Sequence, residues 1–318
     1  MKKVFSILLV LILLAFSLSG CSSDKNTEET VANSENQLTI IATLFPQYDF
    51  AKELTKGTAN VVLLLPPGME SHSYEPTPQD IITIQKSDVF LYTGDDMEPW
   101  VSGIVENLSD TPVVADLSTG ISLQKEEDDE EHAHENEEEH THEYNPHIWT
   151  SPVLAMKMVE NIENALVKAD PENADFYQKN AEEYTKKLED LDQEFRDIVA
   201  AAKHDTVYIG SRFSLLYFME EYGLSYTAAY DSCEEESEPS IKRVVTMIQE
   251  MKENNIKAVY YEELTEPYIA RTIGEAAGAQ ILLFHSCHNV SRDELESGAT
   301  YLSLMEQNAK NLKKGLLE

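Results

Sequence analysis

The sequence predicts an α/β protein of two lobes, each a roughly four-stranded parallel sheet flanked by helices, joined by one long spine helix. Short apolar runs alternate along the chain with amphipathic segments of helical spacing. Near-continuous apolar strands in such an alternation are typical of parallel sheets that helices cover on both faces. A long amphipathic stretch interrupts the alternation and divides it into two halves.

The alternation contains two sets of strands, and each set is expected to form one lobe. The N-terminal lobe is predicted over residues 38–169 and the C-terminal lobe over residues 204–318. The expected strands are residues 38–45, 60–65, 88–94 and 112–116, followed by 206–210, 224–230, 257–263 and 280–285.

Residues 170–203 are predicted to form the helix that links the lobes. Asp170 is expected to cap this helix, and Pro171 suits its first position. The segment is long for a crossover inside one lobe, which favours a spine that joins two. Apolar residues at spacings of three and four predict one buried stripe. The stripe consists of Tyr177, Ala181, Tyr184, Leu188, Leu191, Phe195 and Ile198.

The first residues predict export. Lys2 and Lys3 precede an apolar run that is shorter than the ~20 residues needed to span a bilayer. Small residues follow in LSGC, so residues 1–20 are interpreted as a signal peptide. LSGC resembles a bacterial lipobox, in which the cysteine is lipidated. Cys21 is therefore expected to anchor the protein at the outer face of the bacterial cytoplasmic membrane, through a flexible tether of residues 21–37.

Charge and cysteine content narrow the function further. The formal net charge is −34, which argues against a nucleic-acid partner. Two cysteines, Cys233 and Cys287, remain after Cys21. An exported compartment permits a disulfide between them. The alternative, two thiolates offered to a metal, stays open.

Residues 122–143 are dominated by glutamate and histidine and are predicted to form a loop of the N-terminal lobe. Imidazole is a preferred ligand of zinc, and the carboxylates around it attract divalent cations. We expect low-affinity metal binding here, because an unformed site must be ordered as it binds. A solvated insert with incidental histidines is the alternative. The four histidines form two H-x-H pairs: His132, His134, His140 and His142.

Four other histidines lie where strands end or where a packed segment begins. His72 follows a strand and a Pro-Gly turn in LLLPPGMESHSYEP, and His147 stands between the acidic loop and the apolar run IWTSPVLAM. His285 and His288 follow the last expected strand in LLFHSCHN. Ligand groups in open α/β sheets gather beyond the carboxyl ends of the strands. These positions therefore predict a metal site built from loops at the strand ends.

The chain resembles the zinc and manganese solute-binding lipoproteins of bacterial ABC importers. The resemblance runs from residue 38 to the C-terminus. It rests on LLPPGMESHSYEPTPQDI, NPHIWTSP with the acidic insert before it, YFMEEYGL, EPSIKRV and YLSLMEQN. It implies two α/β lobes joined by one long helix, with the ion in the cleft. It also implies that His72 and His147 are two of the ligands.

The sequence departs from the family pattern at the remaining ligands. Arg212 stands where the family has a His or Glu, and a guanidinium cannot coordinate a cation. HSCHN replaces the usual loop carboxylate, so a histidine is expected to supply the missing nitrogen, with His285 preferred over His288. Arg212 is interpreted as a supporting residue that pairs with Glu262 or Glu263. Cys233 and Cys287 are further candidates if their loops line the cleft.

Imidazole ligands favour Zn²⁺, which binds nitrogen tetrahedrally at about 2.0–2.1 Å. Mn²⁺ favours more carboxylates, and Ni²⁺ and Cu²⁺ are alternatives. The resemblance implies that Zn²⁺ is the transported ligand and that an ABC permease receives it. We expect a monomer with a lipid anchor.

Two other functions are considered. A zinc hydrolase needs an open coordination position and a general base. HENEE lacks the second histidine of H-E-x-x-H, and neither G-x-S-x-G nor a P-loop occurs, which argues against an enzyme. A metal-dependent surface adhesin has no sequence signature and remains an alternative.

Overall fold

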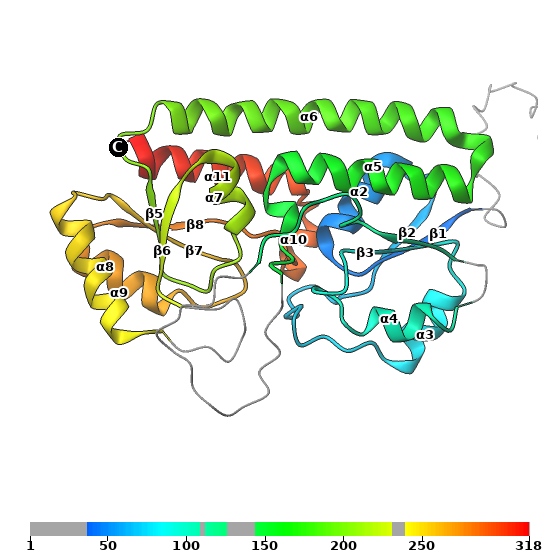
Figure 1. Cartoon of the computed structure of the whole chain (residues 1–318), viewed down its shortest axis with the longest axis horizontal. Helices are drawn as coiled ribbons and strands as arrows, with labels where there is room; N and C mark the ends of the chain where they lie inside the picture. The colour runs from blue at the N-terminus through cyan, green and yellow to red at the C-terminus, as the bar shows by residue number, and fades with distance from the viewer. Residues whose placement is uncertain (1–36, 109–111, 126–143, 231–238, 318) are drawn as a thin grey trace, which may run out of the picture. The chain divides into compact units, whose positions relative to one another are not determined.

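The computed structural model describes residues 37–108, 112–125, 144–230 and 239–317. Residues 37–318 form one compact unit. Within the described part of this unit, the chain builds two parallel sheets of four strands, with helices on both faces (Figure 1). The predicted fold class is therefore confirmed.

The two sheets share one strand order. The first sheet runs β2-β1-β3-β4 and the second runs β6-β5-β7-β8, with every pair parallel. The strands are β1 (Thr39–Ala42), β2 (Asn60–Leu63), β3 (Val89–Tyr92), β4 (Val113–Asp116), β5 (Thr206–Ile209), β6 (Ser225–Ala228), β7 (Ala258–Tyr261) and β8 (Gln280–Leu283). Each lies inside an expected strand, and most are shorter at the ends.

Helices connect successive strands, and side-chain caps fix several of their first turns. Ser151 accepts the backbone N–H of Leu154, and Thr77 accepts that of Asp80. Such caps satisfy N–H groups that have no partner within the helix. The helices are α2 (Phe45–Thr55), α3 (Pro78–Gln85), α4 (Val101–Val105), α5 (Pro152–Ala169), α6 (Ala174–Ala200), α7 (Leu216–Tyr222), α8 (Ile241–Glu253), α9 (Tyr268–Ala277), α10 (Arg292–Glu296) and α11 (Tyr301–Leu317).

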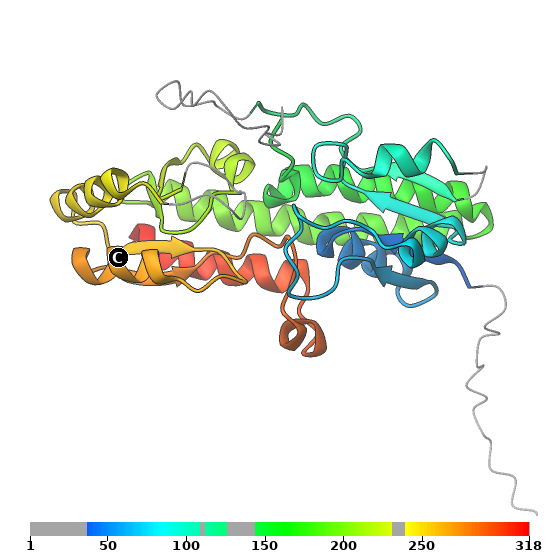
Figure 2. The ribbon, with the colours of Figure 1, turned by 90° about the horizontal axis from the view of Figure 1, so that it is seen from below.

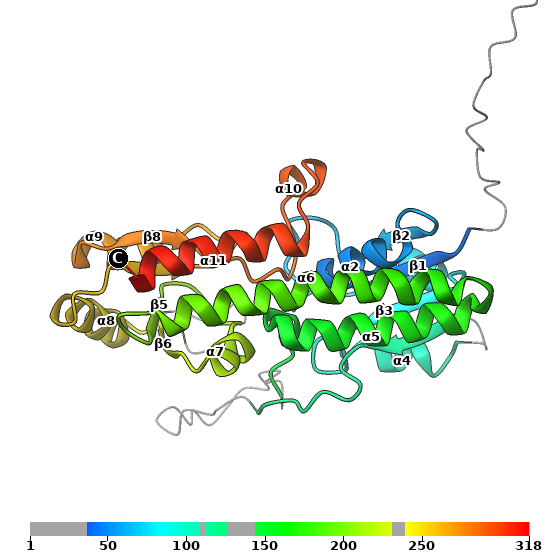
Figure 3. The same ribbon diagram turned by 90° about the horizontal axis from the view of Figure 1, so that it is seen from above.

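Helix α6 runs along both lobes (Figures 1 and 3). It packs against α2 and α5 of the first lobe and against α7 and α11 of the second. All seven residues of the expected stripe are buried. The start differs from expectation, because Pro171–Asn173 forms a 3₁₀ turn and Asn173 caps the α-helix. Asp170 instead accepts hydrogen bonds from the Asn173 amide and the Tyr177 hydroxyl.

One hydrophobic core extends through both lobes. It joins residues of the first sheet, such as Ile40, to residues of the second, such as Ile209, through the buried stripe of α6. Two smaller clusters lie on the opposite faces: α3 and α4 cover the first sheet, and α8 and α9 cover the second. The lobes are therefore held together by hydrophobic packing as well as by the covalent chain.

The loops at the carboxyl ends of the two sheets carry the histidines of interest. The loop before α3 holds His72, the 3₁₀ turn Ile148–Thr150 follows His147, and the loop after β8 holds His285 and His288. Helix α10 projects away from the sheets beside that last loop (Figures 2 and 3). No helix in the described ranges is long and apolar enough to cross a membrane.

Candidate metal centre

His72, His147 and His288 come together from three separate loops. One ring nitrogen of each lies within 4.8 Å of the other two. The Nε2 atoms of His72 and His147 are 3.3 Å apart. Nitrogens bound at about 2.0–2.1 Å around a tetrahedral Zn²⁺ stand roughly 3.3–3.4 Å apart. The spacing of this pair is therefore the one that a shared zinc ion requires.

The loop that carries His72 is fastened to the loop that carries His288. Gly68, at φ +80°, donates its N–H to the carbonyl of Val290 over 2.8 Å. The Asn289 amide donates to the carbonyls of Pro66 and Met69 at 2.8 and 2.9 Å. These bonds hold the Pro-Pro-Gly turn of the first lobe against the second lobe, which places His72 opposite His288.

His147 is fully buried, and Asn145 fixes its ring. The Asn145 side-chain oxygen accepts the backbone N–H of His147 at 3.1 Å and lies 2.9 Å from Nδ1. Because that oxygen only accepts, Nδ1 carries the proton and Nε2 keeps its lone pair. The backbone carbonyl of Asn145 accepts the Tyr217 hydroxyl of α7 at 2.7 Å, which ties the segment to the second lobe.

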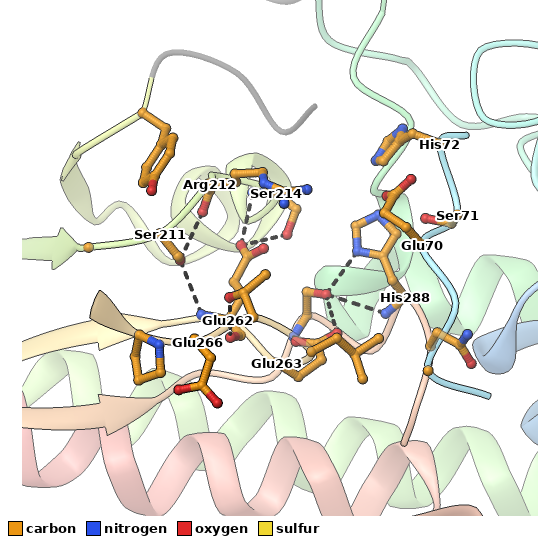
Figure 4. A pocket seen from close by; sticks show the side chains of 18 of the residues that line it. Glu70, Ser71, His72, Ser211, Arg212, Ser214, Glu262, Glu263, Glu266 and His288 are labelled. Carbon is orange, nitrogen blue, oxygen red and sulfur yellow. Dashed lines mark hydrogen bonds between the residues drawn. The ribbon is translucent and has the colours of Figure 1, made fainter. Parts of the chain in front are cut away.

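His288 is oriented through Ser286 and Glu263. The Ser286 hydroxyl donates to Glu263 Oε1 at 2.6 Å, and its N–H donates to Oε2 at 2.7 Å. The same hydroxyl oxygen lies 2.8 Å from His288 Nδ1, so Nδ1–H donates to it. This leaves the lone pair of Nε2 free to face His72, which lies beside His288 in Figure 4. Hydrogen bonds to the second ring nitrogen are what orient metal-binding histidines.

The environment keeps His288 neutral. Burial, followed by the neighbouring His72, His285 and Arg212, lowers the pKa of His288 well below its usual value. Its Nε2 atom is buried and has no hydrogen-bond partner in the described part of the chain. A buried nitrogen of this kind costs free energy unless something binds it. A metal ion would satisfy it.

His285 lies outside this group, so the geometry favours His288 over the expected His285 as the third nitrogen donor. His285 Nδ1 accepts the N–H of Cys287 at 2.9 Å, and Nε2 lies 3.7 Å from Glu294. The physical reason is a chain reversal at Cys287, where φ is +62°. That reversal directs residue 288, and not residue 285, toward His72 and His147.

Arg212 does not form the expected ion pair. Within the described ranges it has no carboxylate within 4.0 Å, although its charge acts on Glu262 at longer range. Glu262 accepts the N–H and hydroxyl of Ser214 at 3.0 and 2.7 Å. Burial, followed by the charge of Glu263, raises the pKa of Glu262 to about 8, so it holds a proton at neutral pH.

The remaining sequence candidates divide in two. Cys287 is a free, fully buried thiol whose sulfur lies 3.8 Å from the carbonyl of His285. The others lie outside the described residues: Cys21, Cys233, His132, His134, His140 and His142.

Sequence reasoning missed the residues that orient the histidines. Trp149 donates its indole N–H to the carbonyl of Ser286 at 2.8 Å, and its ring lies edge-on to His288 with centroids 5.0 Å apart. Asn145, Trp149 and Ser286 all stand inside the motifs that pointed to His147 and HSCHN. Proximity to a ligand histidine was therefore the available signal.

Comparisons with known proteins identify relatives of the chain. Residues 40–315 match the family model of ZnuA, the periplasmic component A of a zinc-uptake complex. The high-affinity zinc uptake system protein ZnuA of Bacillus subtilis (strain 168) is 35% identical over 312 residues, covering 97% of each chain. The zinc-binding lipoprotein AdcA of Streptococcus pneumoniae (strain ATCC BAA-255 / R6) is 33% identical over 318 residues, covering 98% of this chain and 61% of AdcA.

A solved structure extends the likeness to three dimensions. The Zn(II)-bound ZnuA-like domain of Streptococcus pneumoniae AdcA superposes with a TM-score of 0.74 at 30% identity, over 89% of this chain and 100% of that domain. The resemblance seen in the sequence is thereby confirmed. The chain belongs to the ZnuA family, the component A proteins of zinc-uptake complexes.

Proposed function

We propose that this chain captures Zn²⁺ outside the cytoplasmic membrane and delivers it to the permease of an ABC importer. The observation that carries the proposal is the meeting of three imidazole nitrogens from three loops. Relatives named for zinc uptake and zinc binding support the same ion. The chain is a binding protein and not an enzyme, because its family is a component of zinc uptake.

His72, His147 and His288 are the proposed protein ligands. Nδ1 of His147 donates to Asn145, and Nδ1 of His288 donates to Ser286. The Nε2 atom of each ring therefore keeps its lone pair for a metal ion. Imidazoles in a compact set suit Zn²⁺ better than Mn²⁺, which favours oxygen ligands. Within the described ranges, these three ligands leave one tetrahedral position for another group.

We also propose how the chain is organised around this centre. Residues 1–20 are the signal peptide, and lipidated Cys21 with the tether 21–37 holds a monomer at the membrane. The lobes are residues 38–169 and 204–318, linked by residues 170–203. The histidine-rich loop 122–143 collects ions at low affinity, as its H-x-H pairs and carboxylates suggest.

The test compares two histidines of one loop. His288→Gln should abolish tight zinc binding in calorimetric competition with a chelator, because it removes a donor nitrogen from the centre. His285→Gln is the matched control, since its amide oxygen can still accept the Cys287 N–H. It should retain tight binding. The opposite ranking would contradict the proposed ligand set.

A further inference from the structure

The cavity beside the three histidines is larger than a metal ion needs. Its volume is about 350 Å³, and it extends from His72 and His288 over the carboxyl ends of the second sheet to Tyr230 and Glu266 (Figure 4). One water molecule occupies roughly 30 Å³ of liquid. Small-molecule sites begin at about 300 Å³. The cavity therefore has room for an organic molecule next to the ion.

Among the described residues that line this cavity, Arg212 is the one arginine or lysine. Its side chain points across the cavity toward His72 and His288 (Figure 4). After burial, His72 and His285, the charge of Arg212 is a further cause of the lowered pKa of His288, which places the guanidinium within electrostatic reach of the ion site.

The nearest carboxyl groups are engaged elsewhere. Ser214 donates twice to Glu262, and Ser286 donates twice to Glu263. In the described ranges, Arg212 has no carboxylate within 4.0 Å. Its guanidinium donors are therefore directed at the cavity, where they can bind a planar anion through two hydrogen bonds.

We propose that a small carboxylate binds in this cavity together with Zn²⁺, with its oxygens shared between the metal and Arg212. This inference rests on the proposed function. One carboxylate oxygen forms a bond to zinc in the position that the three histidines leave open and displaces a water molecule. The carboxylate also pairs with the guanidinium. Arg212 thus contributes to the coordination sphere through an exogenous ligand, although it cannot bind the metal itself.

The charge of the cavity favours a carboxylate over a more highly charged anion. Zinc and Arg212 provide positive charge at one side. Four glutamates line the cavity as well: Glu262 and Glu263, which accept hydrogen bonds from serines, and Glu70 and Glu266. A dianion such as hydrogen phosphate would meet more repulsion from these glutamates than a monoanion does. Acids that also carry an amine, such as glycine, add a group that the glutamates attract.

The experiment uses the full chain loaded with Co²⁺, whose visible spectrum reports its coordination. Acetate, glycine and phosphate are titrated in a buffer free of other carboxylates. We expect a saturable spectral change with acetate or glycine and a weaker response to phosphate. In zinc titrations with a chelator, the same carboxylate should raise the affinity for Zn²⁺ about tenfold, because it adds a charge-assisted contact with Arg212.

Variants separate this inference from the proposed function. Arg212→Gln should require at least about tenfold more acetate for the same spectral change. Arg271→Gln, which removes an exposed charge of α9, is the matched control and should respond as the unmodified chain does. An unmodified chain that binds Co²⁺ but ignores acetate and glycine, or an unchanged response in Arg212→Gln, would overturn the inference. Failure to bind Co²⁺ or Zn²⁺ at all would overturn the proposed function instead.

Discussion

The two sheets have the same strand order but carry different chemistry at their carboxyl ends. The first sheet presents His72 after β2 and His147 beyond β4. The second presents Arg212 after β5 and a pair of carboxyl groups, Glu262 and Glu263, after β7. Among the residues that the structure describes, His288, beyond β8, is the one that joins the two imidazoles of the first lobe.

The two lobes therefore share a strand order without sharing the side chains that could bind a metal. In the second lobe, one serine donates to one oxygen of Glu262, and another donates to both oxygens of Glu263. The second of these pairs orients His288. The first lobe orients His147 with a single amide, Asn145. The first lobe thus supplies most of the nitrogen donors, and the second supplies one donor with its supporting charge.

The largest loss of zinc affinity is expected when a nitrogen donor of the first lobe is removed. His147→Ala should lower zinc affinity by well over the roughly 100-fold that loss of a supporting hydrogen bond costs, because His147 is a buried and fixed donor. Chelator competition measures the change. An affinity within tenfold of the unmodified chain would exclude His147 from the centre.

The second prediction tests the two serine–glutamate pairs against each other. Ser286→Ala should weaken zinc binding by about 10–100-fold, because Nδ1 of His288 loses its acceptor. Ser214→Ala removes the equivalent hydroxyl from Glu262, which contacts none of the three proposed ligands, and should have a smaller effect. Equal losses in titrations of both variants would contradict the assigned role of Ser286.

The third prediction concerns the bond between the lobes. Trp149→Phe should lower the free energy of unfolding by about 1–3 kcal/mol, because the buried carbonyl of Ser286 loses its donor. Urea denaturation measures this. Trp100→Phe is the control, since Trp100 packs in the cluster under α3 and α4 of the first lobe alone. A larger loss in the control would show that Trp149 is not a joining residue.

The smallest effect at the tight site is expected from the acidic loop. Deleting Glu126 to His142 should lower the number of zinc ions bound while leaving the affinity of the tight site within about threefold, since its proposed ligands lie elsewhere. Calorimetry reports both quantities. Loss of tight binding would show that the loop belongs to the centre.

The sequence predicted the elements well, because apolar runs and helical periodicity are local properties. All eight expected strands and the stripe of α6 are present. The ends were less accurate: the run expected to end at Leu65 leaves its strand at Leu63, although Leu64 and Leu65 stay buried. A buried position favours an apolar residue whether or not it belongs to the strand, so an apolar run does not mark where the strand ends.

The sequence predicted which histidines gather near the site, but not which of their side chains face it. The choice between His285 and His288 depends on the left-handed backbone at Cys287. This conformation is uncommon for residues other than glycine, so the sequence does not predict it. The expected pairing of Arg212 is not present among the described residues: Ser214 donates to one oxygen of Glu262, and Ser286 donates to both oxygens of Glu263. Both outcomes depend on contacts between segments far apart in the chain.

The shared core has a consequence for how a bound ion leaves. Swinging the lobes apart would expose apolar surface along α6, at about 25 cal/mol for each Å². By contrast, the Pro-Pro-Gly turn is held to the second lobe by the hydrogen bonds of Gly68 and Asn289. Peeling back this turn would break these three hydrogen bonds and withdraw His72 without exposing the core along α6.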